Sequence, residues 1–212
     1  SLEWLGLDWD EGPNTGGPYG PYLQSQRLDR YHGEAERMVQ DGNAYHCYCT
    51  PDELAEMRKE KQLRREPPGY NRRCRTLTPE QLRARESLPH VVRFKTPLKG
   101  DPVTVHDVIR GDVTFELSAL DDFVMLKSDG YPTYHLANVV DDHAMRISHV
   151  LRAEEWLPST PRHLLMYAAL GFEPPIFGHL PMLLGSDRSK LAKRHGATSL
   201  LGYRDEGFLP QA

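Results

Sequence analysis

The chain has 212 residues, of which 39% are hydrophobic and 26% are charged, and its formal net charge is −4. This length can bury a substantial core, and the composition is that of a globular protein. The negative balance excludes nucleic-acid binding through a global positive field, and no apolar run reaches the roughly 18 residues of a membrane span. The first residues lack the regions of a signal peptide, and an odd cysteine count argues against a disulfide framework. We therefore expect a cytoplasmic protein without membrane contact.

A loop rich in glycine, proline and aspartate is predicted at residues 8–24. Apolar residues at helical spacing then predict a helix over residues 26–40, with Gly42 as its C-cap. Two further helices have clear starts, because each places a threonine N-cap before a proline and puts a glutamate or glutamine at the third helical position. These starts are Thr50-Pro51-Asp52-Glu53 and Thr78-Pro79-Glu80-Gln81.

Two features lie around the first of these helices. Cys47 and Cys49 precede it and Cys74 follows it, a spacing that matches a structural zinc site lacking one cysteine ligand. The alternative is three ordinary thiols without a metal. A basic stretch forms either a solvated surface or a contact with a phosphate backbone. Its members are Arg58, Lys59, Lys61, Arg64, Arg65, Arg72, Arg73 and Arg75, against Glu60 and Glu66.

Short strands separated by tight turns follow, as in an antiparallel sheet. They are predicted at residues 90–95, 103–106, 112–117 and 123–127.

The character of the sequence changes near Tyr131, from short strands with tight turns to buried strands and a helix. Strand, helix and strand in succession predict an α/β parallel sheet. Its elements are buried strands at residues 134–140 and 147–151, a helix from Ser159-Thr160-Pro161 to Gly171, and a strand near residues 176–177 that leads into the apolar run 179–184.

Polar side chains on two of these strands are candidates for binding. Tyr134, Leu136 and Asn138 share one face by the period of two, so a phenol and a carboxamide could line a small-molecule pocket. The alternative is a core strand with satisfied polar groups. Arg152, after the next strand, could hold a carboxylate in a bidentate fork or form a surface pair with a glutamate.

Lys190 and Lys193 lie three residues apart in a polar loop that follows the apolar run 179–184. Two ammonium groups at this spacing suit a polyanion such as a triphosphate, although charge runs are more often solvated surface.

The strings around these residues are more specific than the residues alone. Lys190-Leu191-Ala192-Lys193-Arg194-His195-Gly196 resembles the KMSKS signature loop of class I aminoacyl-tRNA synthetases, in the variant that glutamyl-tRNA synthetases carry. Residues 131–142 and 151–156 resemble two further runs of that family, and the resemblance covers essentially the whole chain. It implies an α/β fold: an incomplete Rossmann-like parallel sheet of the class I type with an inserted α+β acceptor-binding domain.

The resemblance also implies a site and an activity. Four side chains would bind L-glutamate, namely Tyr134, Asn138, Arg152 and Trp156. Glu155 would contact ATP, the backbone of Leu183 would meet the adenine, and Lys193, helped by Lys190, would neutralise charge on the triphosphate. The implied reaction activates glutamate with MgATP to glutamyl-adenylate and transfers it to the 3′ end of tRNA(Glu).

The resemblance further divides the chain into four parts. Residues 1–42 would complete the first Rossmann half, residues 43–132 would form the insertion, residues 133–186 the second half, and residues 187–212 the signature loop and the start of a stem-contact region. The family's HIGH-type helix start and an anticodon-binding domain do not occur in the sequence. We therefore expect an internal piece of a monomeric synthetase that is inactive in isolation.

Two details of the resemblance concern single positions. Some family members carry zinc at the cysteine site, with a tyrosine or histidine completing the ligands. Thr76 stands where the histidine sometimes is, so Tyr70 is the implied fourth ligand beside Cys47, Cys49 and Cys74, with His46 or water as alternatives. Ala192 replaces the usual serine of the signature loop, which we expect to alter the mobility of the loop more than its role.

Three alternatives remain at this level. Glutamyl-queuosine tRNA(Asp) synthetase is a close relative, although the run Arg152–Trp156 favours the aminoacylating enzyme. Glutaminyl-tRNA synthetase fits less well, because Arg152 suits a carboxylate better than an amide. The third is a tRNA- or protein-binding module without catalysis.

Overall fold

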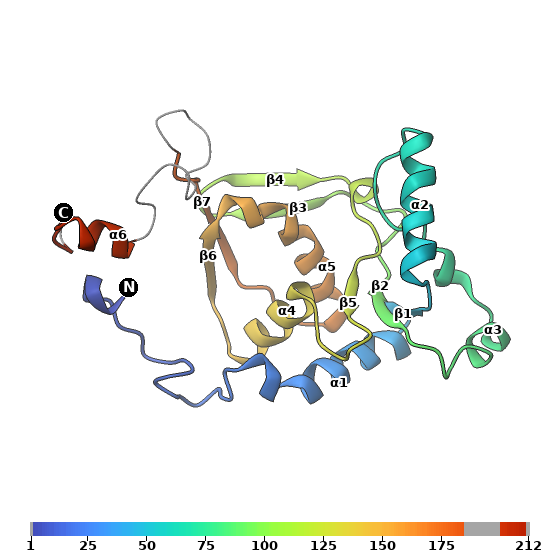
Figure 1. Ribbon diagram of the computed structural model, residues 1–212, viewed down its shortest axis with the longest axis horizontal. Helices are drawn as coiled ribbons and strands as arrows, with labels where there is room; N and C mark the ends of the chain where they lie inside the picture. The colour runs from blue at the N-terminus through green and yellow to red at the C-terminus, as the bar shows by residue number, and fades with distance from the viewer. Residues whose placement is uncertain (1, 185–199, 211–212) are drawn as a thin grey trace.

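The structure is a computed structural model that describes residues 2–184 and 200–210. It has an α/β fold with two open sheets (Figure 1). The helices are α1 (Leu28–Gln40), α2 (Pro51–Leu63), α3 (Pro79–Arg83), α4 (Tyr134–Ala144), α5 (Thr160–Leu170) and α6 (Leu200–Asp205). The strands are β1 (Ala44–Cys47), β2 (Val91–Phe94), β3 (Val103–Asp107), β4 (Gly111–Phe115), β5 (Val124–Leu126), β6 (His149–Ala153) and β7 (Ile176–Leu180). No helix in the described ranges is long and apolar enough to cross a bilayer.

The two sheets differ in strand direction. The first has the order β1-β2-β5 and is antiparallel throughout. The second has the order β4-β3-β7-β6, in which β7 runs parallel to both β3 and β6 while β4 is antiparallel to β3. The hairpin of β3 and β4 lies within the residues assigned to the insertion, yet it extends the sheet of β6 and β7 through one registered pair, Asp107 with Phe177.

In the main hydrophobic core, α1 and α4 pack on the first sheet, while α5 packs against α4 and on β3 of the second sheet. In Figure 1, α4 and α5 lie at the centre and α1 runs along the lower edge. Tyr31 from α1, Met125 from β5 and Met166 from α5 are fully buried there. Each large apolar side chain buried in this way stabilises the fold by about 1.5–3 kcal/mol. A smaller cluster lies beside α2 and contains Cys47, Met57, Tyr70 and Cys74.

The prediction of a strand at residues 134–140 is wrong, because these residues form helix α4. The buried side chains, Leu136, Ala137, Val139 and Val140, follow helical spacing. A short apolar run does not separate a buried helix from a buried strand by periodicity, and here packing against α1 and α5 decides for the helix. Leu136 therefore points into the core rather than sharing a face with Tyr134 and Asn138.

The helix starts predicted from threonine caps are confirmed. Thr50 and Thr78 each accept the backbone N–H three residues on, while Glu53 and Gln81 bond back to the threonine N–H, which completes both capping boxes. Helix α5 ends at Gly171, whose φ of 67° is left-handed. Helix α1 ends at its C-cap Asp41, one residue before the predicted Gly42. Strand β1 was missed by the sequence reasoning.

Candidate functional site

A group of side chains converges on Arg152, near the end of β6. Its Nε donates to His179 Nε2 at 3.1 Å, Nη1 donates to the Tyr134 hydroxyl, and Nη2 donates to Thr160 Oγ1 at 2.9 Å and to the Trp156 carbonyl at 3.4 Å. None of these acceptors is a carboxylate, so Arg152 keeps its positive charge unpaired within the described ranges. A partly buried guanidinium in this state has the charge and the donors to bind an anion.

Aromatic rings form one wall beside this cation. The ring centroids of Tyr134 and Trp156 are 4.8 Å apart, and the two side chains are 39% and 41% exposed. The Tyr134 hydroxyl accepts a hydrogen bond from Arg152, so its own proton stays available to a ligand. Burial is the main cause that raises the pKa of Tyr134, which keeps the phenol protonated.

Asn138 lies four residues after Tyr134, on the same face of α4. Its Oδ1 is buried and has no hydrogen-bond partner within residues 2–184 and 200–210. A buried acceptor without a donor lowers the stability of the fold. A ligand with an N–H or O–H group could supply the missing hydrogen bond. The pairing of Tyr134 with Asn138 survives the correction from strand to helix.

A buried aspartate and histidine lie behind Arg152. The Asp107 Oδ2 and His179 Nδ1 atoms are 2.6 Å apart, and both side chains have no exposed surface. Burial alone would raise the pKa of Asp107, but hydrogen bonds from the His179 side chain and from backbone N–H groups outweigh it and lower the pKa to about 2. The sequence analysis missed both residues, because they lie 72 positions apart and no local motif marks them.

The predicted ATP contacts are described only in part. Glu155 and Leu183 are exposed. The preceding residue, Glu154, accepts the Met182 backbone N–H at 3.0 Å and forms an ion pair with Arg110, so it fixes the chain just before Leu183. Lys190, Lys193 and Ala192 lie outside the described residues.

The three cysteines come together as predicted. Their Sγ atoms lie within 4.8 Å of one another, and those of Cys49 and Cys74 are 3.6 Å apart. The Tyr70 hydroxyl is 3.2 Å from Cys47 Sγ and 3.3 Å from Cys49 Sγ. Hydrogen bonds from Cys74 and Tyr70 lower the pKa of Cys47, so one thiolate is favoured in this group, while burial raises the pKa of Cys49.

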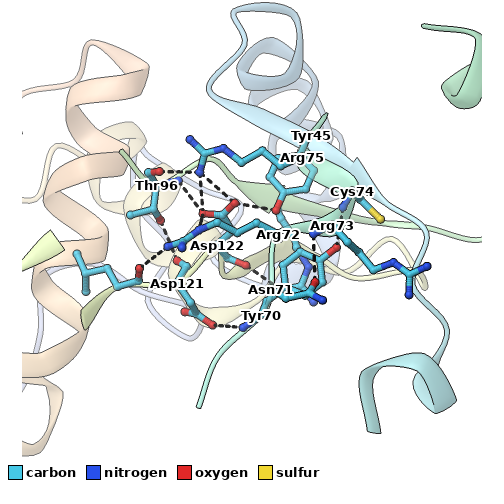
Figure 2. Close-up of polar contacts among 12 residues, drawn as sticks. Tyr45, Tyr70, Asn71, Arg72, Arg73, Cys74, Arg75, Thr96, Asp121 and Asp122 are labelled. Carbon is cyan, nitrogen blue, oxygen red and sulfur yellow. Dashed lines mark hydrogen bonds and ion pairs between the residues drawn. The ribbon is translucent and has the colours of Figure 1, made fainter. Parts of the chain in front are cut away.

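The basic stretch is divided by the fold, as Figure 2 shows. Asp122 is fully buried, and its carboxylate accepts hydrogen bonds from Arg72 Nε and from Arg75 Nη1, each at 3.1 Å. It also accepts the Tyr45 hydroxyl at 2.8 Å and the Thr96 N–H at 3.2 Å. Two arginines assigned to a possible phosphate contact therefore share one buried carboxylate, which offsets one of their two positive charges.

The remaining members of the stretch stay near the surface. Arg73 pairs with Glu53 at 3.1 Å, and Arg64 lies 3.7 Å from Glu60 on α2. Exposed pairs of this kind contribute little stability. A phosphate contact stays a prediction for the exposed basic residues of α2 and for Arg73, whereas Arg72 and Arg75 bond to the buried Asp122.

Comparison with known proteins decides the family of this site. The family described as "tRNA synthetases class I (E and Q), catalytic domain" matches residues 1–212. The chain belongs to this family. Its α/β fold with open sheets is that of a class I synthetase, which confirms the fold implied by the signature loop.

The relatives of this synthetase domain are named glutamate–tRNA ligases. A glutamate–tRNA ligase of Dehalococcoides mccartyi is 62% identical over 211 residues, and one of Moorella thermoacetica is 56% identical over 214 residues. Both alignments take in 100% of this chain but 42% and 44% of the relatives. The chain thus spans less than half the length of the curated relatives it matches.

Solved structures agree with the sequence comparison. A crystal structure of a glutamate tRNA ligase from Elizabethkingia meningosepticum, in complex with its amino acid, superimposes with a TM-score of 0.90 at 40% identity. That of the glutamate–tRNA synthetase from Elizabethkingia anophelis gives 0.89 at 40% identity. Each match covers 99% of this chain, and 47% and 48% of those chains.

Proposed function

We propose that the protein containing this chain is a glutamate–tRNA ligase, which activates L-glutamate with MgATP and transfers it to the 3′ end of tRNA(Glu). The names of the relatives support this activity. The observation that carries it is the charge state of Arg152, a partly buried cation with no carboxylate partner among the described residues. Nothing in the comparisons favours a glutamyl-queuosine synthetase or a module without catalysis.

Arg152 and Tyr134 form the receptor for the glutamate side-chain carboxylate. An arginine has five N–H donors, and the protein takes four of those of Arg152, which leaves one on Nη1. This N–H and the Tyr134 O–H are the two donors that a carboxylate needs. The buried Oδ1 of Asn138 accepts from the substrate ammonium group, and Trp156 covers the aliphatic carbons.

The chemical step is a displacement at the α-phosphorus of ATP. An oxygen of the substrate α-carboxylate forms a bond to that phosphorus, and the bond to the leaving pyrophosphate breaks. No protein nucleophile is needed, so the enzyme contributes position and charge stabilisation. Glu155 and the backbone of Leu183 hold the nucleoside, while Lys193, helped by Lys190, meets the negative charge on the departing phosphates.

The cysteine cluster is proposed to hold one structural zinc ion. Its ligands are Cys47, Cys49, Cys74 and the Tyr70 hydroxyl. Ligands about 2.3 Å from a tetrahedral zinc lie roughly 3.8 Å from one another, and the observed 3.6 Å between Cys49 Sγ and Cys74 Sγ fits this spacing. The zinc would tie the end of β1 to the segment before α3, inside the insertion that we propose receives the tRNA acceptor end. We also propose that the enzyme is a cytoplasmic monomer.

Exchange of Arg152 tests the proposed function most directly. In the full-length enzyme, Arg152→Ala should raise the KM for glutamate at least about 100-fold in ATP–pyrophosphate exchange, because a charged hydrogen-bonding partner of the substrate is lost. The KM for ATP should change less than about threefold. Arg37→Ala, on the surface of α1, is the matched control. An unchanged glutamate KM in the Arg152→Ala enzyme would contradict the proposal.

A further inference from the structure

The orientation of Arg152 depends on a chain of two buried side chains that reaches back to another strand. His179, on β7, lies 3.1 Å from Arg152 through its Nε2, and its Nδ1 lies 2.6 Å from Asp107 at the end of β3. Three strands of the second sheet thus each contribute one member: β3, β7 and β6. All three residues lie at or near the carboxyl ends of these strands.

The chemistry of arginine fixes the protons along this chain. Arginine donates hydrogen bonds and cannot accept them, so the Nε2 atom of His179 must present a lone pair to Arg152. The ring proton of the neutral imidazole is then on Nδ1, where it is donated to the Asp107 carboxylate. Thr160 Oγ1 lies 3.3 Å from the same Nε2 atom and accepts a hydrogen bond from Arg152 Nη2. The guanidinium is therefore held at both Nε and Nη2.

Asp107 itself is held rigidly. Its Oδ1 accepts three backbone N–H groups, those of Ile109 at 3.0 Å, Arg110 at 2.9 Å and His179 at 3.1 Å. This oxygen therefore has a fixed place, and the other oxygen faces His179. A carboxylate so constrained defines one tautomer of the histidine and one direction for its ring.

We propose that Asp107 and His179 are positioning residues for Arg152, and that the interposed neutral histidine orients the guanidinium without neutralising it. A carboxylate in direct contact would occupy the N–H fork and cancel the charge that an anion needs. The imidazole supplies an acceptor for Nε without adding a negative charge, so the cation and the remaining N–H of Nη1 stay available to an anion. This inference deepens the proposed function, because it rests on Arg152 binding the glutamate carboxylate.

The substitution Asp107→Asn tests this arrangement with little change in shape. The amide oxygen must remain at the three backbone N–H groups, so the amide NH₂ turns toward His179 and donates to Nδ1. The ring proton then moves to Nε2 and faces the N–H of Arg152, donor against donor. In the full-length enzyme we expect the KM for glutamate to rise about 10- to 100-fold, the range found when outer partners of metal ligands are lost. The KM for ATP should change less than about twofold.

A double-variant comparison separates positioning from general damage. In an Arg152→Ala background, Asp107→Asn should cause no further rise in the glutamate KM, because its effect passes through Arg152. A further rise there, or an equal rise in the ATP KM, would overturn the inference. If Arg152→Ala alone leaves the glutamate KM unchanged, the proposed function fails instead. If Arg152→Ala raises it and a folded Asp107→Asn enzyme does not, only the positioning role fails.

A spectroscopic measurement decides the matter even if Asp107→Asn does not fold. Nitrogen-15 NMR of histidine-labelled wild-type enzyme, with His179→Gln to assign the signal, reports which ring nitrogen carries the proton. A proton on Nδ1 is expected. A proton on Nε2, or on both nitrogens at neutral pH, would overturn the proposal.

Discussion

Two buried aspartates, Asp122 beside the first sheet and Asp107 in the second, contact arginine side chains in different ways. Asp122 contacts Arg72 and Arg75 directly, at 3.1 Å each, so its single negative charge is shared between two arginines and offsets one of their charges. Asp107 reaches Arg152 through His179, and the charge of that arginine remains unpaired within the described ranges. In our proposal, the interposed ring makes the difference between an arginine that holds the fold together and one that binds an anionic ligand.

The comparison also separates basic residues that are tied to a buried carboxylate from those that stay exposed. A guanidinium whose charge is matched by a buried carboxylate gains little from a phosphate, since the existing pair would have to be broken first. Arg72 and Arg75 share one such carboxylate, Asp122, and their side chains are 32% and 13% exposed. The exposed basic residues of α2 have no such constraint.

The largest expected effect is on stability at Asp122. Asp122→Ala should lower the free energy of unfolding by about 3–5 kcal/mol, because it leaves two arginines, Arg72 and Arg75, without their buried partner. Urea denaturation measures this change. The control is Asp129→Ala, which removes an exposed pair with Lys127 and should cost less than about 1 kcal/mol. Similar losses in the two variants would show that the Asp122 cluster is no more than a surface pair.

The zinc proposal is expected to give an effect of intermediate size. Protein purified without added metal should contain one zinc per chain, and the double variant Cys47→Ser, Cys49→Ser should contain none, as measured by elemental analysis. At a free zinc concentration about 100 times the dissociation constant, bound metal stabilises the folded state by about 2.7 kcal/mol, so a chelator should lower the melting temperature of the wild type alone. Zinc retained by the double variant would contradict this ligand set.

A third carboxylate, Asp142 on α4, is expected to have the smallest effect on the free energy of unfolding. Burial raises its pKa to about 6, although a hydrogen bond from Tyr167 lowers it. The folded state therefore binds this proton more tightly than the unfolded chain, whose carboxyl pKa is about 3.9. The resulting stabilisation is complete below about pH 4 and is lost as the pH rises through 6.

The substitution Asp142→Asn should remove that dependence. Because the side chain is partly exposed, we expect the variant to be more stable than wild type by about 1 kcal/mol above pH 7 and equal to it near pH 4. Unfolding curves at the two pH values measure the difference. A gain of the same size at both would mean that ionisation of Asp142 is not its cause.

Local signals in the sequence were sufficient for some elements and not for others. The threonine caps at Thr50 and Thr78 and the stop at Gly171 were predicted correctly, because their hydrogen bonds form within four residues of the chain. The helix at residues 134–140 was not predicted correctly, because a short apolar run that is buried on several sides is compatible with either a helix or a strand. Tyr134 and Asn138 were nevertheless paired correctly, since residues four apart share a face in both periods.

The sequence by itself determined the family, the capped helices and the set of cysteines, through motifs whose members are close neighbours or have characteristic spacing. The tertiary structure decided which polar and charged side chains meet. Asp122 lies 47 positions from Arg75, and Asp107 lies 72 positions from His179. Whether two such side chains meet depends on distances and burial across the sheets. The spacing of residues in the sequence specifies neither.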